Sequence, residues 1–186
     1  MNSSSQNRND ARLEQAAVVN VLLLLVHAHA TSVAIFLRRD FGKEALAANS
    51  LVAMFILFVM ATQDPVFMTY LGIFLAMQIY RRIETFRKAW RGEIWHSLYP
   101  GYPYIALKLR NVTDERKAVQ VAEPSICVLV GLAFLPISEL LGLYIMLAGV
   151  SLVLRNGVND LLDRKRIQQM YDARCEHEWY SNQTRR

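Results

Sequence analysis

Residues 125–154 read SICVLVGLAFLPISELLGLYIMLAGVSLVL and contain one charged residue, Glu139, and one proline, Pro136. Lipid offers no hydrogen-bond partner to an exposed peptide group, so an apolar run of this length predicts helix inside a bilayer. One straight helix of this run would be about 45 Å long at about 1.5 Å per residue, which exceeds the hydrocarbon core of about 30 Å. The run therefore predicts an all-α, multi-pass membrane protein.

The composition of the whole chain agrees with this class. The chain has 186 residues, of which 53% are hydrophobic, more than the 45–50% or so of soluble domains. A net charge of +5 could indicate nucleic acid as a partner, but basic residues beside membrane spans more often reflect orientation and anionic headgroups. The two cysteines are too few for a disulfide framework. We expect the lipid bilayer, and no nucleic acid, as a partner.

Residues 1–15 are polar and predict a disordered amino-terminal tail. The membrane region 16–80 then contains three apolar runs, which predict spans at 16–37, 45–63 and 65–80. Asp64 and Pro65 separate the last two spans, because proline disfavours helix in the residue before it and suits the first turn of a new helix. Spans two and three should therefore form a hairpin.

A competing interpretation of the first run is a cleaved signal peptide, with its cleavage site at Ala28-His29-Ala30. Against it, the apolar run continues through Phe36, and acidic residues stand before the run. Cleavage would also place the most basic segment of the chain outside the cell, which the positive-inside rule disfavours.

Residues 81–124 form a basic segment rich in aromatic side chains, and its first part repeats apolar residues at steps of three or four. This spacing predicts an amphipathic helix that binds the membrane surface or a partner, with a soluble helix packed on a neighbour as the alternative. Thr113 predicts the start of a short surface helix that ends near Ala122, and Pro124 should begin the next helix. The residues predicted for docking are Arg82, Arg87, Lys88, Trp90, Arg91 and Trp95.

The distribution of Lys and Arg predicts the orientation. Two precede the first span, three follow it, none lie at the Asp64 turn, nine lie in residues 81–124 and seven follow Leu154. Placing the last two segments and the first linker in the cytosol puts nineteen of twenty-one inside. The amino terminus and Asp64 are then outside, and the carboxy terminus is in the cytosol, most simply at a bacterial inner membrane.

Because both flanks of residues 125–154 are cytosolic in this orientation, the run must return to the side from which it entered. We therefore predict a hairpin bent at Pro136, which either crosses twice or is re-entrant, with Glu139 near its tip. Small residues at Gly131, Gly142 and Gly149 would let helices approach closely. Residues 155–186 repeat apolar side chains among charges and predict a cytosolic helical tail.

A search for chemical motifs gives little. His27 and His29 are intramembrane candidates for function, but two residues apart on a helix they face opposite sides and cannot hold one metal or haem. Cys175 and His177 have no second pair of ligands nearby in the sequence. No phosphate loop, dinucleotide fingerprint or hydrolase motif is present. The sequence predicts no catalytic residues, no metal and no cofactor.

The expected function is that of an integral membrane subunit of a larger envelope assembly, which docks protein partners on its cytosolic face. The alternative is a small homo-oligomeric channel or transporter, with Asn20, Gln78, Glu139 and the histidines lining a path. An intramembrane enzyme is the third reading, and it would need polar residues clustered at one membrane depth. The chain could form homo- or hetero-oligomers under the first two.

Overall fold

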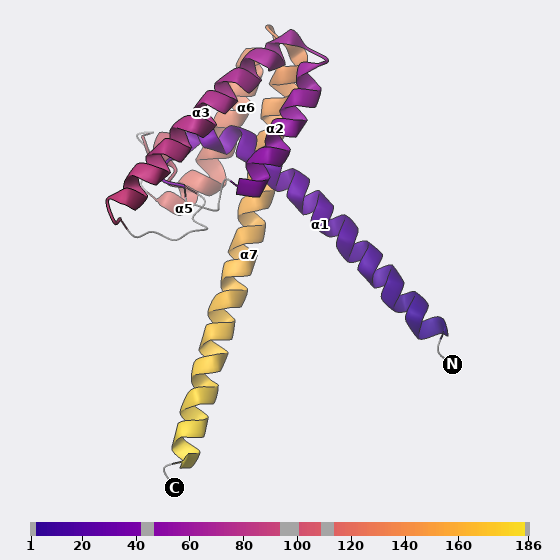
Figure 1. The fold of residues 1–186 in the computed structure, drawn as a ribbon, viewed down its shortest axis with the longest axis vertical. Coiled ribbons are helices and arrows are strands. Elements are labelled where there is room, and N and C mark those ends of the chain that lie inside the picture. The colour runs from indigo at the N-terminus through magenta and orange to yellow at the C-terminus, as the bar shows by residue number, and fades with distance from the viewer. Residues whose placement is uncertain (1–2, 42–46, 94–100, 109–113, 185–186) are drawn as a thin grey trace.

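The computed structural model describes residues 3–41, 47–93, 101–108 and 114–184, and these residues are helical apart from turns and short loops (Figure 1). The described residues form no strand, and an isolated antiparallel bridge joins Arg39 to Tyr102. The elements in chain order are α1 (Ser3–Leu37), α2 (Ala47–Ala61), α3 (Pro65–Trp90), α4 (Tyr104–Leu107), α5 (Glu115–Lys117), the π-helix η1 (Ala118–Ala122), α6 (Glu123–Phe134) and α7 (Glu139–Thr184).

Three helical stretches are long and apolar enough to cross a membrane: Leu13–Leu37, Glu115–Phe134 and Glu139–Ser181. The prediction of a helical membrane protein with transmembrane helices is confirmed at this level. The predicted span at 45–63 corresponds to α2, whose apolar part, Asn49–Ala61, is shorter than these three. The predicted span at 65–80 is the first part of the longer helix α3.

Two helical hairpins lie side by side, and their turns meet at one end of the bundle (Figure 1). At the first turn, Asp64 caps α3 by accepting a hydrogen bond of 2.8 Å from the Val66 amide, and Pro65 occupies the first turn of the helix. At the second turn, the Ser138 hydroxyl accepts a hydrogen bond of 3.1 Å from the Leu141 amide. The Ser138 hydroxyl also donates to the Asp64 carboxylate, so the two capping residues hold the two turns together.

The run 125–154 is broken where its proline stands. Helix α6 ends at Phe134, a turn contains Pro136, and α7 begins at Glu139. The amides of Ile137 and Ser138 donate to the Phe134 carbonyl at 3.0 and 2.9 Å, which closes the turn tightly. Proline has no amide to donate and cannot continue a regular helix without loss, so the break follows from the sequence.

Four boundaries expected from the sequence lie inside continuous helix. Helix α1 begins at Ser3, so the predicted disordered tail at residues 1–15 is helical from Ser3 and runs without a break into the first apolar run. Helix α3 passes through position 80, because Arg81 is buried and pairs with Glu84 one turn later at 2.9 Å instead of ending the helix. Helix α7 likewise continues through position 154 as a single helix. The predicted separate helices beginning after these positions are therefore extensions of the membrane-region helices.

The chain also does not restart at Pro124. Helices α5, η1 and α6 follow one another without a break, with Pro124 in the first turn of α6. The π-helix η1 lies directly before this proline, and its wider turn accommodates a residue that cannot donate to the preceding turn. The cap of α5 is Asp114, whose carboxylate accepts from the Arg116 amide at 3.1 Å; the predicted Thr113 start lies outside the described residues.

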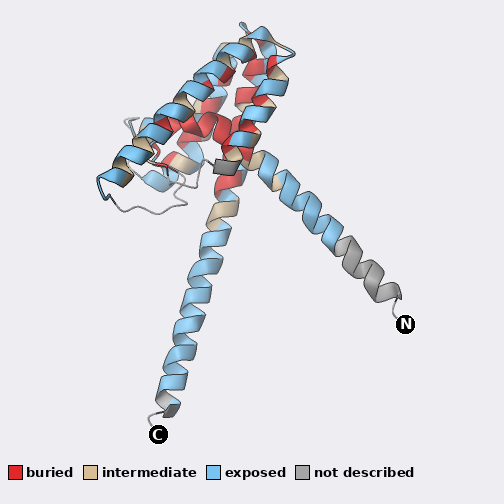
Figure 2. Ribbon diagram, viewed as in Figure 1, coloured by how far each residue is buried: buried red, intermediate tan, exposed pale blue. Residues whose placement is uncertain are grey.

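The buried core lies where α1, α2, α3, α6 and α7 pack together, and the two longest helices extend beyond it (Figure 2). Buried residues of α1 begin at Ala28, and those of α7 end at Asn156. We call residues 13–27 the free half of α1 and residues 157–181 the free half of α7. Both free halves leave the bundle on the side opposite the Asp64 and Ser138 turns (Figure 1).

Candidate functional site

The basic residues predicted for docking lie on the last turns of α3. Arg82, Arg87 and Arg91 are exposed, and Trp90 is 97% exposed. Lys88 forms an ion pair with Asp40, just after α1, and so ties the end of α3 to the rest of the bundle. Trp95 lies outside the described residues. The end of α3 therefore presents three exposed guanidinium groups and one exposed indole.

The two histidines have different surroundings. The His27 ring is hydrogen-bonded at 2.8 Å to the Leu23 carbonyl of its own helix. His29 faces α7, where Nδ1 lies 2.9 Å from the Ser151 hydroxyl and Nε2 lies 3.2 Å from the Tyr144 carbonyl. The rings of His29 and Tyr144 are also in contact in a tilted arrangement, with centroids 4.4 Å apart and an interplanar angle of 53°. His29 is thus a packing and hydrogen-bonding residue between α1 and α7, and the two histidines do not converge.

The three glycines lie between the arms of the α6–α7 hairpin. A Cβ added at Gly142 would lie 2.8 Å from the Gly131 carbonyl oxygen, and one added at Gly131 would lie 2.7 Å from the Gly142 carbonyl oxygen. A Cβ at Gly149 would lie 3.1 Å from the carbonyl oxygen of Pro124. Only residues without side chains permit the two backbones to approach this closely.

The polar residues suggested for a channel are not brought together in one chain. Glu139 is exposed at the first position of α7, beside the turn. Asn20 is exposed on the free half of α1, and Gln78 lies on α3 facing α2. Within the described residues, these side chains do not line a common path.

The most concentrated polar site is a buried network at the open end of the hairpins, which the sequence analysis did not predict. The Arg38 guanidinium contacts the Glu123 carboxylate through two nitrogens, with Nε at 2.9 and 3.0 Å from its oxygens and Nη2 at 2.5 Å. Both side chains are almost fully buried, at 1% and 0% exposure. Nη2 also donates to the Asn156 side chain at 3.3 Å, so the network joins α1, α6 and α7.

A second buried arginine, Arg155, lies beside this pair. Its Nη1 donates to the Thr31 hydroxyl at 3.4 Å, and its Nε has no hydrogen-bond partner in the described part of the chain. The Asn156 amide donates at 2.9 Å to the Val119 carbonyl in η1, one of the carbonyls that a π-helix leaves differently placed from those of an α-helix. Asn156 therefore couples the buried ion pair to η1. The sequence does contain a signal, because Arg38 directly follows one apolar run and the oppositely charged Glu123 stands just before another. Nothing in the sequence shows that these two residues pair.

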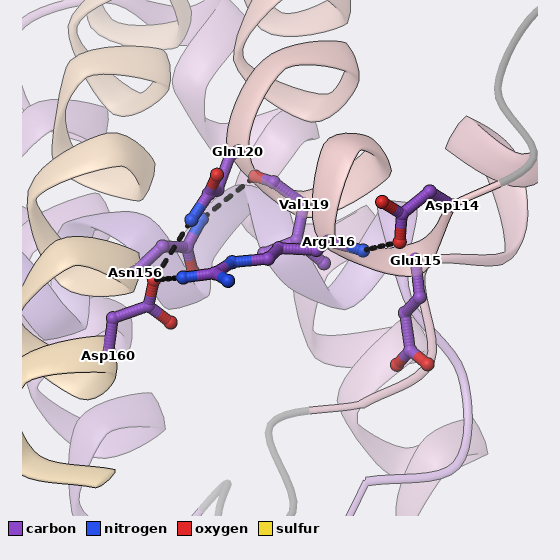
Figure 3. Close-up of a pocket in the computed structure, with 7 residues that line it drawn as sticks. All are labelled: Asp114, Glu115, Arg116, Val119, Gln120, Asn156 and Asp160. Atoms are coloured by element: carbon purple, nitrogen blue, oxygen red, sulfur yellow. Dashed lines mark hydrogen bonds and ion pairs between the residues drawn. The ribbon is translucent and has the colours of Figure 1, made fainter. Parts of the chain in front are cut away.

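A pocket of about 370 Å³ opens above this network between α5, η1 and α7 (Figure 3). The Asp160 carboxylate accepts from Arg116 at 3.2 Å and from Gln120 at 2.9 Å across the pocket. Asp114 is occupied in capping α5. No group of three His, Cys, Asp or Glu side chains in the part of the chain that the structure describes is placed to hold a metal ion. The pocket residues fasten α5 to α7, and no nucleophile, base and orienting group converge there.

The loop before α4 is fastened to the end of α1. Arg39 and Tyr102 exchange backbone hydrogen bonds of 2.9 and 2.6 Å, and the Arg39 guanidinium lies 3.6 Å from the centroid of the Tyr104 ring. Hydrogen bonding and charge from Lys108, followed by the charge of Arg39, hold the pKa of Tyr104 below its usual value. Gly101 has φ of +94°, and an added Cβ would lie 2.9 Å from Phe41. This part of the basic, aromatic-rich segment 81–124 is therefore a loop packed against the end of α1.

Comparison with protein-family models, with curated proteins and with solved structures finds no match to this chain.

Proposed function

We propose that this chain is an integral membrane subunit of a larger envelope assembly, in secretion, transfer or transport, and that it docks cytosolic protein partners. The observation that carries the proposal is the free half of α7. It extends for 25 residues beyond the last buried residue, Asn156, and its side chains from Leu161 to Ser181 are exposed wherever they are described. A single helix of this kind is marginally stable alone in water, and a partner that packs on it would supply the missing contacts.

The surface of this free half suits a protein partner. Its charged residues keep it soluble, while apolar and aromatic side chains stand exposed among them, a combination typical of the rim and centre of interfaces. These exposed side chains include Leu161, Leu162, Ile167, Met170, Tyr171 and Trp179. The end of α3, with Arg87, Trp90 and Arg91, is the second docking element of the proposal.

The proposed orientation follows the charge distribution: Asp64 outside, residues 81–124 and the carboxy terminus in the cytosol of a bacterium, and the amino terminus outside. The α6–α7 hairpin then enters and leaves from the cytosolic side. Both free halves leave the bundle on the same side in Figure 1, whereas the charge distribution places the amino and carboxy termini on opposite sides of the membrane. The side of the amino terminus therefore needs its own test.

An impermeant thiol reagent on intact cells should label a lone cysteine at Ser4 or Gln63 but not at Ser181. Labelling at Ser181 would overturn the orientation, and an unreactive Ser4 beside a reactive Gln63 would move the amino terminus inside.

The docking function is tested by copurification of the full chain from its native membrane in a mild detergent. Ile167→Asp places a charge on an exposed apolar site of α7, and Gln168→Asp places the same charge on its exposed polar neighbour. We expect Ile167→Asp to reduce the amount of partner protein that copurifies at a stoichiometric ratio by about tenfold or more, as loss of a central interface contact does. Gln168→Asp should leave this amount unchanged. A homo-oligomer without any other protein would instead favour the channel or transporter.

A further inference from the structure

A groove of about 320 Å³ lies between α2 and α3, toward the open end of their hairpin. Leu51 and Met54 line it from α2, and Leu75 and Ile79 line it from α3. All four side chains are exposed in the bundle. The volume is at the lower end of the range for small-molecule sites, and an open groove with such walls in a membrane region suits a hydrocarbon chain.

One polar side chain inside this groove has no partner among the residues that the structure describes. Both the nitrogen and the oxygen of the Gln78 amide are buried, and neither makes a hydrogen bond within these residues. Buried polar groups in proteins are nearly always paired, because an unpaired one loses its hydration without compensation. The amide therefore points to a ligand that carries a hydrogen-bonding group into the groove.

The groove also contains a cationic side chain. Arg82 lies four residues after Gln78 on the same face of α3 and lines the same groove. It is exposed and forms no ion pair with any residue in the described ranges. By contrast, its neighbour Arg81 is buried and pairs with Glu84. Leu75, Gln78 and Arg82 thus supply an apolar wall, an unpaired amide and a cation in that order along α3, and Ile83 and Phe86 continue the groove beyond Arg82.

We propose that this groove binds an anionic diacyl phospholipid, with one acyl chain between α2 and α3 and the phosphate on Arg82. Guanidinium groups bind phosphate oxygens through paired, charge-assisted hydrogen bonds. The Gln78 amide nitrogen, one helical turn deeper, donates to an ester or phosphate oxygen of the same lipid. The order of the three features along α3 is the order of tail, glycerol ester and phosphate in the lipid. The site is separate from the free half of α7, which carries the proposed docking function, because all of its lining residues belong to α2 and α3.

The test uses the full chain in detergent micelles, with phosphatidylglycerol and phosphatidylcholine of identical acyl chains as probes, and counts retained lipid by native mass spectrometry. We expect the wild-type chain to retain phosphatidylglycerol over phosphatidylcholine by about tenfold, the effect of one charge-assisted contact. Arg82→Gln should remove most of this preference. Lys117→Gln, which removes the same charge from an exposed position on α5, outside the groove, should preserve it.

Gln78→Leu supplies a second readout that a surface-charge effect would not move. Without lipid it should raise the Tm, because the unpaired amide is gone, and with phosphatidylglycerol it should show a smaller gain in Tm than the wild type. Equal loss of preference in Arg82→Gln and Lys117→Gln would overturn the proposal in favour of diffuse charge attraction. Equal retention of the two lipids, or a lipid-free dimer that covers Leu51 and Ile79, would overturn it as well.

Discussion

The free halves of α1 and α7 leave the same bundle, but their surfaces are opposite in polarity. Residues 13–27 carry one charged side chain, and three of their apolar residues that are more than half exposed are Val18, Val21 and Leu22. Residues 157–181 carry nine charged side chains. Both free halves are α-helical, so the chemistry of their side chains alone indicates their surroundings. The side chains of α1 suit lipid or an apolar partner, and those of α7 suit water or a polar interface.

The largest effect is expected where the packed parts of both helices meet. Arg38→Met leaves Glu123 buried without its main partner, and we expect it to lower the free energy of unfolding by about 3–5 kcal/mol. The double variant Arg38→Met/Glu123→Met should recover most of this loss, because two apolar side chains of similar volume can replace a buried pair. Reversible unfolding in detergent micelles measures both variants.

Arg116→Gln is the control for this comparison. It removes the exposed ion pair of Arg116 with Asp160, whose side chains are 59% and 39% exposed, and exposed pairs contribute at most about 1 kcal/mol. If Arg116→Gln cost as much as Arg38→Met, the stability of this end of the bundle would depend on α5 and the pocket rather than on the buried pair.

The second prediction compares the free halves directly. Leu22→Arg places a charge on the apolar free half of α1, where a bilayer would oppose it by about 2.5–3.5 kcal/mol at the helix centre. Leu161→Arg makes the same change on the free half of α7, at a similar exposure of 62% against 57%. We expect Leu22→Arg to lower the amount of protein recovered in the membrane fraction and Leu161→Arg to leave it unchanged. Equal recovery of both would mean that the free half of α1 does not lie in lipid.

The sequence was a good guide wherever a local signal fixes the backbone. The apolar runs predict helices, and three helical stretches of the described chain are long and apolar enough to cross a membrane. Asp64-Pro65 and Pro136 mark the two turns, because these residues act on their immediate neighbours. Composition changes were a poor guide to helix ends. Arg81 follows an apolar run and reads as a boundary, yet its pairing with Glu84 on the same helix face lets α3 continue.

The site was harder to predict, because it depends on contacts between distant residues. Arg38 and Glu123 are 85 positions apart, and no periodicity in the sequence relates them. The unpaired amide of Gln78 becomes informative only once α2 covers it. The glycines were recognisable as contact residues, but only the structure shows that Gly131 and Gly142 face each other.

The third prediction uses two glycines of α7, one in the packed half and one in the free half. Gly142→Ala brings a Cβ to within 2.8 Å of the Gly131 carbonyl oxygen, and overpacking of this kind costs about 1–3 kcal/mol. Gly157→Ala meets no atom within 4 Å, so it should stabilise the helix by about 0.5–1 kcal/mol. Thermal unfolding of the two variants gives opposite shifts in Tm if α6 and α7 are in close contact, and shifts of the same sign if they are not.

The smallest effect is expected at the turns, the exposed end of the bundle opposite both free halves. The hydrogen bond from the Ser138 hydroxyl, followed by that from the Val66 amide, holds the pKa of Asp64 below its usual value. A carboxyl group with a lowered native pKa stabilises the fold at pH values above its unfolded pKa of about 3.9, and this stabilisation is lost as the pH falls through the native pKa. The Tm of the wild-type chain should therefore fall with acidification below about pH 4 more steeply than that of Asp64→Asn, whose neutral amide does not titrate.

Asp163→Asn is the matched control, because Asp163 lies on the free half of α7 and its ion pair with Arg166 on the same helix is long, at 3.8 Å. It should leave the pH dependence of the Tm as it is in the wild type. If Asp163→Asn reduced the fall of the Tm at acid pH as much as Asp64→Asn does, the acid sensitivity would reflect the total charge of the chain. It would then not reflect the contact that joins the two hairpin turns.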